Sequence, residues 1–464
     1  MSDLLNKKEC GWNNLTEEKR GAIFQFCDGY IQFLNNVKTE REANKRIISD
    51  LKIAGFRSID DIQILSEGDK VYLDNRGKGV FAVVIGREKL TDGINMIGAH
   101  IDSPRLDLKP NPVYEDCKLG LFKTHYYGGI KKYQWTTIPL AIHGVIVKAN
   151  GEKQEIMIGE DDGDPIFTIT DILPHLSQKQ YEKKIGDAIE GESLNVLIGS
   201  IPDEENDSVK ENILKLLNEK YGIKEIDFCS SEIEIVPAFK ARDLGFDRSM
   251  VAAYGQDDRV CAYSLLQALL NKENSKNTCV AIFSDKEEIG SYGNTGMHSD
   301  VFDYFINELL NKTNLNKAGA INEVYCHSRM LSADVGTGVD PNYQDVSEVN
   351  NSAYIGYGIE LNKYTGSRGK SGASDANCEF VAYVRNIFEQ NNIKYQVAEL
   401  GKVDLGGGGT IAYILADKGI DVLDCGVPVI SMHSPCEVTS KFDIYTAYLA
   451  YKAFFESEGH VMYI

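Results

Sequence analysis

Two different spacings of hydrophobic residues occur along the chain, and they predict different elements. The acids Glu17 and Glu18 follow Thr16, which is typical of a helix start. Apolar residues then recur at helical spacing at Ile23, Phe26, Tyr30, Phe33 and Leu34. Short apolar runs at 79–85 and 94–98 are bounded by turn-forming residues and predict strands.

From about residue 240 onward, strand-like and helix-like patterns alternate. Residues 278–284 form a continuous apolar run typical of a buried strand, whereas the stretch leading into 261–270 and the segment after Ser374 have helical spacing. This alternation predicts an α/β domain with a central, mostly parallel sheet. The β-rich stretches 138–147 and 155–158 and the charged stretch 202–207 interrupt it, which indicates an inserted β-rich domain.

Composition and charge narrow the classes of protein that fit. The chain has 464 residues, 43% hydrophobic and 25% charged, which is ordinary globular composition and enough for two or three domains. A net charge of −20 repels polyanions, so we expect no nucleic acid partner. No signal peptide or membrane-spanning stretch is recognisable, so we expect a soluble, cytoplasmic protein with no membrane partner and with mostly buried, reduced cysteines.

The candidate chemistry lies in five short segments that follow predicted strands, where open α/β sheets build their sites. The segments are His100-Ile-Asp102-Ser-Pro104, Gln256-Asp-Asp-Arg259, Asp285-Lys-Glu-Glu-Ile-Gly290, Ser332-Ala-Asp334 and Ser431-Met-His-Ser434. Each is a weak signal by itself. The other histidines, including His298 and His460, lie outside these segments and are assigned structural or surface roles.

Each segment has a structural and a chemical interpretation. Strand alternation places His100 and Asp102 on the same side, so Asp102 can orient the imidazole of a metal ligand, or the pair can belong to an ordinary polar turn. Asp257 and Asp258 either cap a helix or include a carboxylate that bridges two cations. Of Glu287 and Glu288, one can bind a metal while its neighbour serves as a general base; alternatively both lie in a solvated turn.

Together the segments supply two histidines and at least three carboxylates, a donor set that suits zinc, cobalt or manganese. With Asp257, Glu288 and Asp334 as ligands beside neutral His100 and His433, one divalent ion leaves a net negative site. Two ions and one hydroxide balance the charge, so the count favours two metals.

In this order the segments resemble the M18 family of metallo-aminopeptidases, the aspartyl aminopeptidase and vacuolar aminopeptidase I group. The motifs His-x-Asp-Ser-Pro, Asp-Asp-Arg, Glu-Glu-Ile-Gly-Ser, Ser-Ala-Asp and Ser-Met-His-Ser are jointly specific, and the resemblance covers nearly the whole chain. It implies a metal-dependent aminopeptidase, a hydrolase that removes the N-terminal amino acid from peptides.

The resemblance also implies roles for individual residues. His100, Asp257 and Asp334 would bind one zinc ion, and Asp257, Glu288 and His433 the other, with Asp257 as the bridge. Glu287 would be the general base, and Asp102 would orient His100.

At the level of the whole molecule, the resemblance implies a dinuclear-zinc exopeptidase-like α/β catalytic domain at 1–108 and 241–464, interrupted by a β-rich dimerisation domain at 109–240. Similar members form tetrahedral dodecamers built from dimers, so we expect a homo-oligomer.

The chain departs from the family pattern at three places. Val335-Gly-Thr-Gly-Val-Asp340 replaces a stretch in which many members carry two histidines, and Gln178-Lys179 stands near the place of a histidine that reaches a neighbouring subunit. Glu360 stands at or near the lysine that pairs with an acidic substrate. Because a glutamate repels an acidic side chain, we predict a preference for neutral or basic N-terminal residues.

Three alternatives remain open on the sequence alone. A related dinuclear-metal carboxypeptidase or amidohydrolase would use a similar ligand set. A non-catalytic peptide-binding scaffold would keep the fold and lose the chemistry. Leu405-Gly-Gly-Gly-Gly-Thr410 raises nucleotide binding, but it lacks the Gly-Lys-Ser/Thr ending of a phosphate-binding loop and favours close backbone packing or a wall of a substrate pocket.

Overall fold

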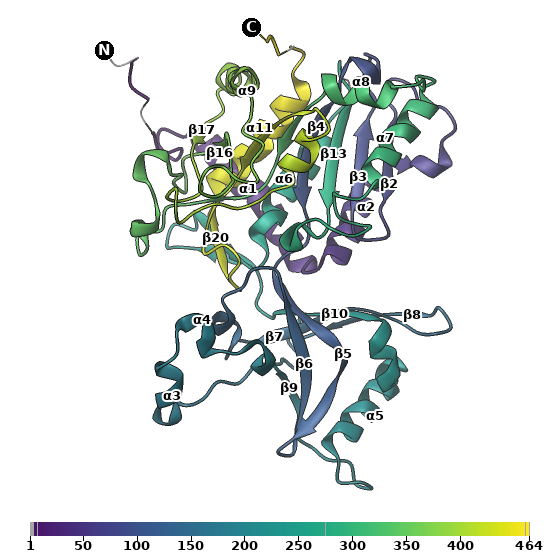
Figure 1. The fold of residues 1–464 in the computed structure, drawn as a ribbon, viewed down its shortest axis with the longest axis vertical. Helices are drawn as coiled ribbons and strands as arrows, with labels where there is room; N and C mark the ends of the chain where they lie inside the picture. Colours follow the sequence, from purple (N-terminus) through teal and green to yellow (C-terminus); the bar gives the residue numbers. More distant parts are fainter. Residues whose placement is uncertain (1–3, 7, 274, 460, 464) are drawn as a thin grey trace. The chain divides into compact units, whose positions relative to one another are not determined.

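The structure is a computed structural model that describes residues 4–6, 8–273, 275–459 and 461–463, so His460 lies outside the described residues. Its contacts divide the chain into two compact units (Figure 1). Unit 1 comprises Met1–Asp102, Ala241–Met432 and Glu437–Ile464, and unit 2 comprises Ser103–Lys240 and His433–Cys436. The boundaries drawn from the sequence were 108/109 and 240/241.

Unit 1 is built on a nine-stranded sheet of the described residues, in the order β1-β2-β3-β13-β4-β14-β18-β16-β17. Taken in chain order, the strands are β1 (Arg57–Ser58), β2 (Lys70–Asp74), β3 (Val80–Val84), β4 (Asn95–His100), β13 (Cys279–Ser284), β14 (Arg329–Ser332), β16 (Ile359–Asn362), β17 (Tyr395–Val397) and β18 (Asp421–Gly426). The four central strands β13, β4, β14 and β18 are mutually parallel, so their carboxyl ends meet at one edge. The predicted α/β architecture is confirmed.

Helices cover both faces of this sheet (Figure 1). One apolar core takes side chains from α1 (Glu17–Asn36), α2 (Glu40–Ile53), α6 (Gln256–Leu270), α9 (Cys378–Gln390) and α11 (Lys441–Glu456). A second core, on the other face, takes them from α7 (Val301–Lys312), α8 (Ala320–His327) and α10 (Ala412–Ala416). Because both faces are covered, β4 and β13 are buried along their whole length, which explains their continuous apolar runs.

Unit 1 also contains a smaller five-stranded sheet with the order β11-β12-β20-β19-β15. Its strands are β11 (Arg242–Leu244), β12 (Met250–Ala253), β15 (Gly336–Thr337), β19 (Pro428–Ile430) and β20 (Glu437–Ser440). Two of them flank functional segments: β15 begins two residues after Asp334, and the loop between β19 and β20 contains His433.

Unit 2 is β-rich, with a six-stranded antiparallel sheet in the order β8-β7-β10-β5-β6-β9. The strands are β5 (Arg105–Asp116), β6 (Leu119–Tyr127), β7 (Leu140–Val147), β8 (Lys153–Ile158), β9 (Val196–Gly199) and β10 (Ser231–Pro237). Helix α5 (Val209–Tyr221) follows β9, and two short helices, α3 (Gln178–Tyr181) and α4 (Ile185–Ala188), lie between β8 and β9 in the chain. The apolar runs at 138–147 and 155–158 therefore form β7 and β8.

The helix start predicted at Thr16 agrees with the first helix of the structure. Thr16 caps α1, accepting a hydrogen bond from the Lys19 amide at 3.2 Å.

The expectation of mostly buried cysteines is wrong: all ten are free, and Cys117, Cys229, Cys326, Cys378 and Cys436 are exposed. Among the described residues, no helix combines the length and apolar character needed to cross a membrane.

Candidate metal centre

The carboxyl edge of the central sheet brings three of the five predicted segments together. β4 ends at His100, which is in register with Ser284 at the end of β13. β14 ends at Ser332, in register with Gly98 of β4. Because these strands are parallel, the residues that follow them, including Glu287 and Asp334, meet beside His100.

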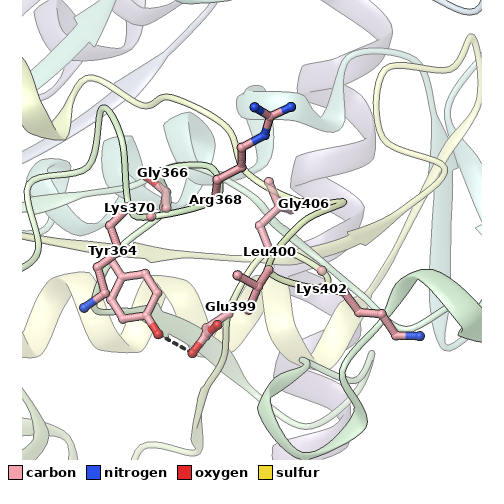
Figure 2. A pocket seen from close by; sticks show the side chains of 12 residues that line it. Tyr364, Gly366, Arg368, Lys370, Glu399, Leu400, Lys402 and Gly406 are labelled. Carbon is pink, nitrogen blue, oxygen red and sulfur yellow. Dashed lines mark hydrogen bonds between the residues drawn. The ribbon is translucent and has the colours of Figure 1, made fainter.

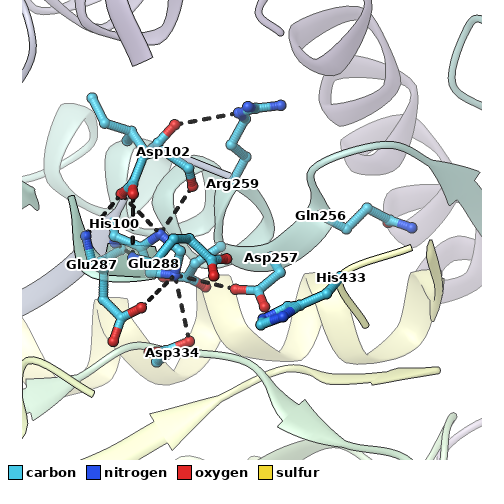
Figure 3. Close-up of polar contacts among 12 residues, drawn as sticks. His100, Asp102, Gln256, Asp257, Arg259, Glu287, Glu288, Asp334 and His433 are labelled. Atoms are coloured by element: carbon cyan, nitrogen blue, oxygen red, sulfur yellow. Dashed lines mark hydrogen bonds and ion pairs between the residues drawn. The ribbon is translucent and has the colours of Figure 1, made fainter. Parts of the chain in front are cut away.

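His100 is the centre of a carboxylate cluster, and its side chain is only 2% exposed. Its Nε2 atom lies 3.1 Å from Asp257 Oδ1, 3.8 Å from Asp334 Oδ1 and 4.0 Å from Glu287 Oε2 (Figure 3). The structure therefore brings these four predicted residues together from the ends of β4, β13 and β14 and from the first turn of α6.

Asp102 connects His100 to the segment that carries the two glutamates. Its Oδ1 lies 3.3 Å from His100 Nδ1. The same carboxylate accepts hydrogen bonds from the backbone amides of Glu287 and Glu288, both at 3.2 Å (Figure 3). One buried side chain thus holds both the imidazole and the short helical turn Glu287–Ile289.

The first turn of α6 carries Asp257 and Asp258, and neighbouring groups fix both. The Glu437 carboxylate accepts from the amides of Gln256 at 2.6 Å and of Asp257 at 3.1 Å. Asp258 accepts from the backbone amide of His100 at 3.2 Å. Glu437 is the first residue of β20, and no role was predicted for it from the sequence because it lies outside the five segments.

Arg259 holds the chain around the site. Its guanidinium is buried and donates to the carbonyl oxygens of Lys38 at 2.8 Å and Ile101 at 3.4 Å. Neither contact is to a carboxylate, so Arg259 does not neutralise the cluster through these bonds.

The electrostatics of the cluster call for positive charge. Burial raises the pKa of Glu287 to about 8, and repulsion from Asp334 adds to the effect. Burial likewise raises the pKa values of Asp334 and Asp258. Burial alone would lower the pKa of His100, but hydrogen bonds with Asp102, Asp257 and Asp334 raise it well above its usual value. Each shift has the direction expected when carboxylates are crowded without a cation.

The donor set fits a divalent metal. His100, Asp257 and Glu288 offer ligand atoms that all lie within 4.8 Å of one another, and so do His100, Asp258 and Asp334. One imidazole with several carboxylates is a donor mixture typical of zinc. Asp258 is a member that the sequence-derived ligand set did not include.

His433 belongs to unit 2 and to neither of these two groups. It lies in the loop between β19 and β20 with a left-handed backbone (φ 63°). Its Nδ1 is 2.9 Å from the carbonyl oxygen of Gly129, which orients the ring. Its assignment as a zinc ligand stays a prediction.

A family model described as Aminopeptidase I zinc metalloprotease (M18) matches residues 33–455. Among curated proteins, a probable M18 family aminopeptidase 1 from Clostridium acetobutylicum is 53% identical over 460 residues, which are 98% of this chain and 99% of that protein.

Solved structures of M18 aminopeptidases also match the chain. The crystal structure of an M18 aminopeptidase from Thermotoga maritima is 45% identical, with a TM-score of 0.94, covering 97% of this chain and all of that one. An S. cerevisiae mApe1 dodecamer shares the fold with a TM-score of 0.74 at 19% identity, over 95% of this chain and 97% of that one.

Proposed function

The chain belongs to the M18 family of zinc metallo-aminopeptidases, and from that premise we propose that it releases the N-terminal amino acid of peptides at the His100 cluster. The single observation that carries the assignment to this cluster is the convergence of His100 with Asp257, Glu287 and Asp334 within 3.1–4.0 Å at the carboxyl edge of the sheet.

The proposed centre would hold two zinc ions per chain, with cobalt or manganese as possible substitutes. His100, Asp257 and Asp334 would hold one ion, and Asp257, Glu288 and His433 would hold the other. Three carboxylates leave a net charge of −1 around one divalent ion, whereas two ions leave room for one anionic ligand. When bound, zinc supplies Lewis-acid polarisation and makes water more acidic.

The residues of the chain supply the proton transfers and the alignment. Glu287 accepts the proton of the attacking water and delivers it to the leaving amine. Asp102 keeps His100 and the Glu287 segment in fixed relation, because it contacts both. The free amine of the substrate would pair with a carboxylate of the site or bind a metal, which restricts cleavage to the terminal peptide bond.

A comparison of free and acetylated peptides tests this function. The zinc-loaded protein should hydrolyse a peptide with a free N-terminus and should leave its N-acetylated form intact. A carboxypeptidase or amidohydrolase would cleave the acetylated peptide, and a non-catalytic scaffold would cleave neither.

We propose that neutral or basic N-terminal residues are preferred. Glu360 lies on β16, and its carboxyl group packs against Gly336, two residues after Asp334. A Cβ atom added at Gly336 would stand 1.9 Å from Glu360 Oε2. Where the family lysine would supply a positive charge, Glu360 supplies none, so an acidic substrate side chain has no cation to pair with here. A panel of aminoacyl substrates should show higher kcat/KM for Leu or Lys than for Asp or Glu, and faster turnover of the acidic derivatives would refute the preference.

A further inference from the structure

Three aromatic side chains lie together at the surface of unit 1, on two segments that are far apart in the sequence. Tyr292 and His298 belong to the loop that follows the turn Glu287–Ile289, and Tyr413 belongs to α10. The rings of Tyr292 and His298 are stacked, with centroids 4.4 Å apart and an interplanar angle of 13°. His298 Nε2 lies 2.9 Å from the hydroxyl oxygen of Tyr413, within hydrogen-bond distance. We call these three side chains the aromatic cluster.

The aromatic cluster adjoins the turn that carries the proposed general base. The Gly290 amide closes this turn by donating to the carbonyl oxygen of Glu287 at 2.8 Å. A Cβ atom added at Gly290 would stand 3.5 Å from Tyr292 Cδ2, so the Tyr292 ring lies directly beside the end of the turn. Burial is the main cause that raises the pKa of Tyr413, and the charges of Tyr292 and Glu287 add to it. Both tyrosines are therefore close to the Glu287 turn.

The loop that carries Tyr292 and His298 is fixed by its own contacts. The Ser291 amide donates to the carbonyl oxygen of Lys286 at 2.7 Å, and the His298 amide donates to the carbonyl oxygen of Ser291 at 3.1 Å. Met297, next to His298, is 2% exposed and belongs to the second apolar core. Because the loop is anchored at both ends, the two rings are in place before a ligand binds, which lowers the entropy cost of binding.

The loop that leads into α10 is fixed as well, and it sets the position of Tyr413. Gly406 lies beside Leu400 (Figure 2), and a Cβ atom at Gly406 would overlap the carbonyl oxygen of Leu400. The run of glycines therefore packs backbone against backbone. The hydroxyl of Thr410, just before α10, donates to the buried carboxyl group of Asp424 at 2.7 Å.

The aromatic cluster keeps apolar surface open to a ligand. Tyr292 is 67% exposed, although His298 covers one face of its ring. An aromatic ring that is already ordered gains contacts and apolar burial when another apolar or aromatic side chain packs against it. The group that fits this surface best is therefore an apolar or aromatic side chain.

The place of the aromatic cluster beside Glu287 indicates which part of a peptide it meets. In the proposed reaction, Glu287 delivers a proton to the leaving amine. That amine belongs to the residue after the scissile bond, so this residue has to lie next to Glu287 when the bond breaks. Its side chain is then the part of the substrate nearest to Tyr292 and Tyr413.

We propose that the aromatic cluster binds the side chain of the residue after the scissile bond and gives the enzyme a preference for an apolar or aromatic residue there. Tyr292 and Tyr413 contact this side chain, and His298 holds the two tyrosines in relation to each other. The proposal rests on the proposed peptidase function and deepens it. It concerns the second residue of the peptide, whereas the preference argued from Glu360 concerns the first.

Kinetics of the zinc-loaded, full-length protein with three peptide amides test the proposal. Leucyl-phenylalanine amide and leucyl-glycine amide differ only after the scissile bond, and phenylalanyl-glycine amide moves the ring to the N-terminal residue. The ratio of kcat/KM for leucyl-phenylalanine amide to that for leucyl-glycine amide should be about tenfold in the wild type and about twofold in Tyr292→Ala. The control Tyr304→Ala, at a tyrosine of α7 that is 52% exposed, should keep the wild-type ratio.

A binding measurement shows that Tyr292 acts on the substrate rather than on the placement of Glu287. The probes are reduced-amide analogues of the two leucyl peptides, in which a CH₂ group replaces the scissile carbonyl, so neither can be hydrolysed. By calorimetry, the phenylalanine analogue should bind about tenfold more tightly than the glycine analogue, and Tyr292→Ala should remove most of this difference.

The outcomes separate this proposal from the peptidase function. Equal kcat/KM for the two leucyl peptides, or equal affinity for their analogues, would overturn the proposal and leave the peptidase function standing. A Tyr292→Ala variant that lowers turnover of phenylalanyl-glycine amide more than that of leucyl-phenylalanine amide would also overturn it, because the cluster would then contact the N-terminal residue. Failure to hydrolyse any of the three amides would overturn the peptidase function itself.

Discussion

The proposed role of Glu287 as general base can be tested separately from zinc binding. Its Oε2 lies 4.0 Å from His100 Nε2, and it is not among the proposed zinc ligands. Glu287→Gln keeps the shape and removes the base, so zinc content should stay the same while kcat falls by about 10²–10⁴-fold. Peptidase assays with metal analysis check this, with the surface variant Glu308→Gln as control. Turnover within a few-fold of wild type would remove Glu287 from this role.

Glu360 makes a testable contribution to stability because it is 1% exposed and burial raises its pKa to about 8. In the unfolded chain the carboxyl ionises near pH 4.3. Between these values the folded state retains a proton that the unfolded state has lost, so the contribution of Glu360 to stability falls as pH rises.

Glu360→Gln removes this titration. The free energy of unfolding of the variant relative to wild type should therefore increase from pH 5 to pH 8, by about 1 kcal/mol or more. Urea unfolding at several pH values measures this, with the exposed Glu389→Gln as matched control. A difference that does not change with pH would show that Glu360 is ionised in the fold.

Residue types were predictable at the site, but their partners were not. His100, Asp257, Glu287 and Asp334 stand out only as a set, because each of their segments is a weak signal by itself. Glu437 and Asp258 act on Asp257 and His100 through backbone amides, and only the folded chain brings those amides to them. No sequence spacing encodes such contacts.

At the scale of elements, Asp102 joins the end of β4 to the turn after β13. Asp102→Asn keeps the size but loses the negative charge that faces His100 Nδ1 and two backbone amides. Zinc affinity should fall by about 10–100-fold, since groups that orient a ligand have effects of this size. Chelator competition measures the affinity.

The control for Asp102→Asn is the same substitution at an aspartate outside the cluster. Asp74→Asn changes an acid at the end of β2, outside the cluster, and should leave zinc affinity unchanged. Wild-type zinc affinity in Asp102→Asn would contradict the orienting role.

Element types followed from the pattern for the long, capped helix α1 and for the continuous apolar run of β13. The central sheet is mostly parallel, as predicted, but the sequence did not indicate which strands run the other way: β16 runs antiparallel to β18, and β3 runs antiparallel to β13. Strand direction depends on how the connections cross the sheet, which local patterns do not record.

At the scale of the whole molecule, we predict that the chain assembles through unit 2. Apolar side chains between β8 and β9 are unusually exposed, among them Leu176 at 68% and Tyr181 at 71%. Exposed apolar clusters of this kind mark protein interfaces. The proposed assembly is a homo-oligomer of dimers, with the tetrahedral dodecamer as its expected form.

Sedimentation analysis tests this assembly. The double variant Leu176→Asp with Tyr181→Asp should sediment as a smaller species than wild type, whereas Ile53→Asp, at an exposed residue of α2, should not change the assembly. A wild-type chain that sediments as a stable monomer would contradict the prediction.

The inserted domain at 109–240 stays a prediction, made from the β-rich runs 138–147 and 155–158 and the charged stretch 202–207. The return of residues 433–436 to unit 2 was not visible, since four residues carry no pattern of their own.

Anomalous diffraction at the zinc absorption edge, from crystals of the zinc-loaded chain, tests the proposed centre most directly. We predict two anomalous peaks per chain, both in contact with Asp257, one also bound by His100 and Asp334 and the other by Glu288 and His433. A single peak, or peaks that none of these side chains touches, would contradict the two-zinc aminopeptidase centre.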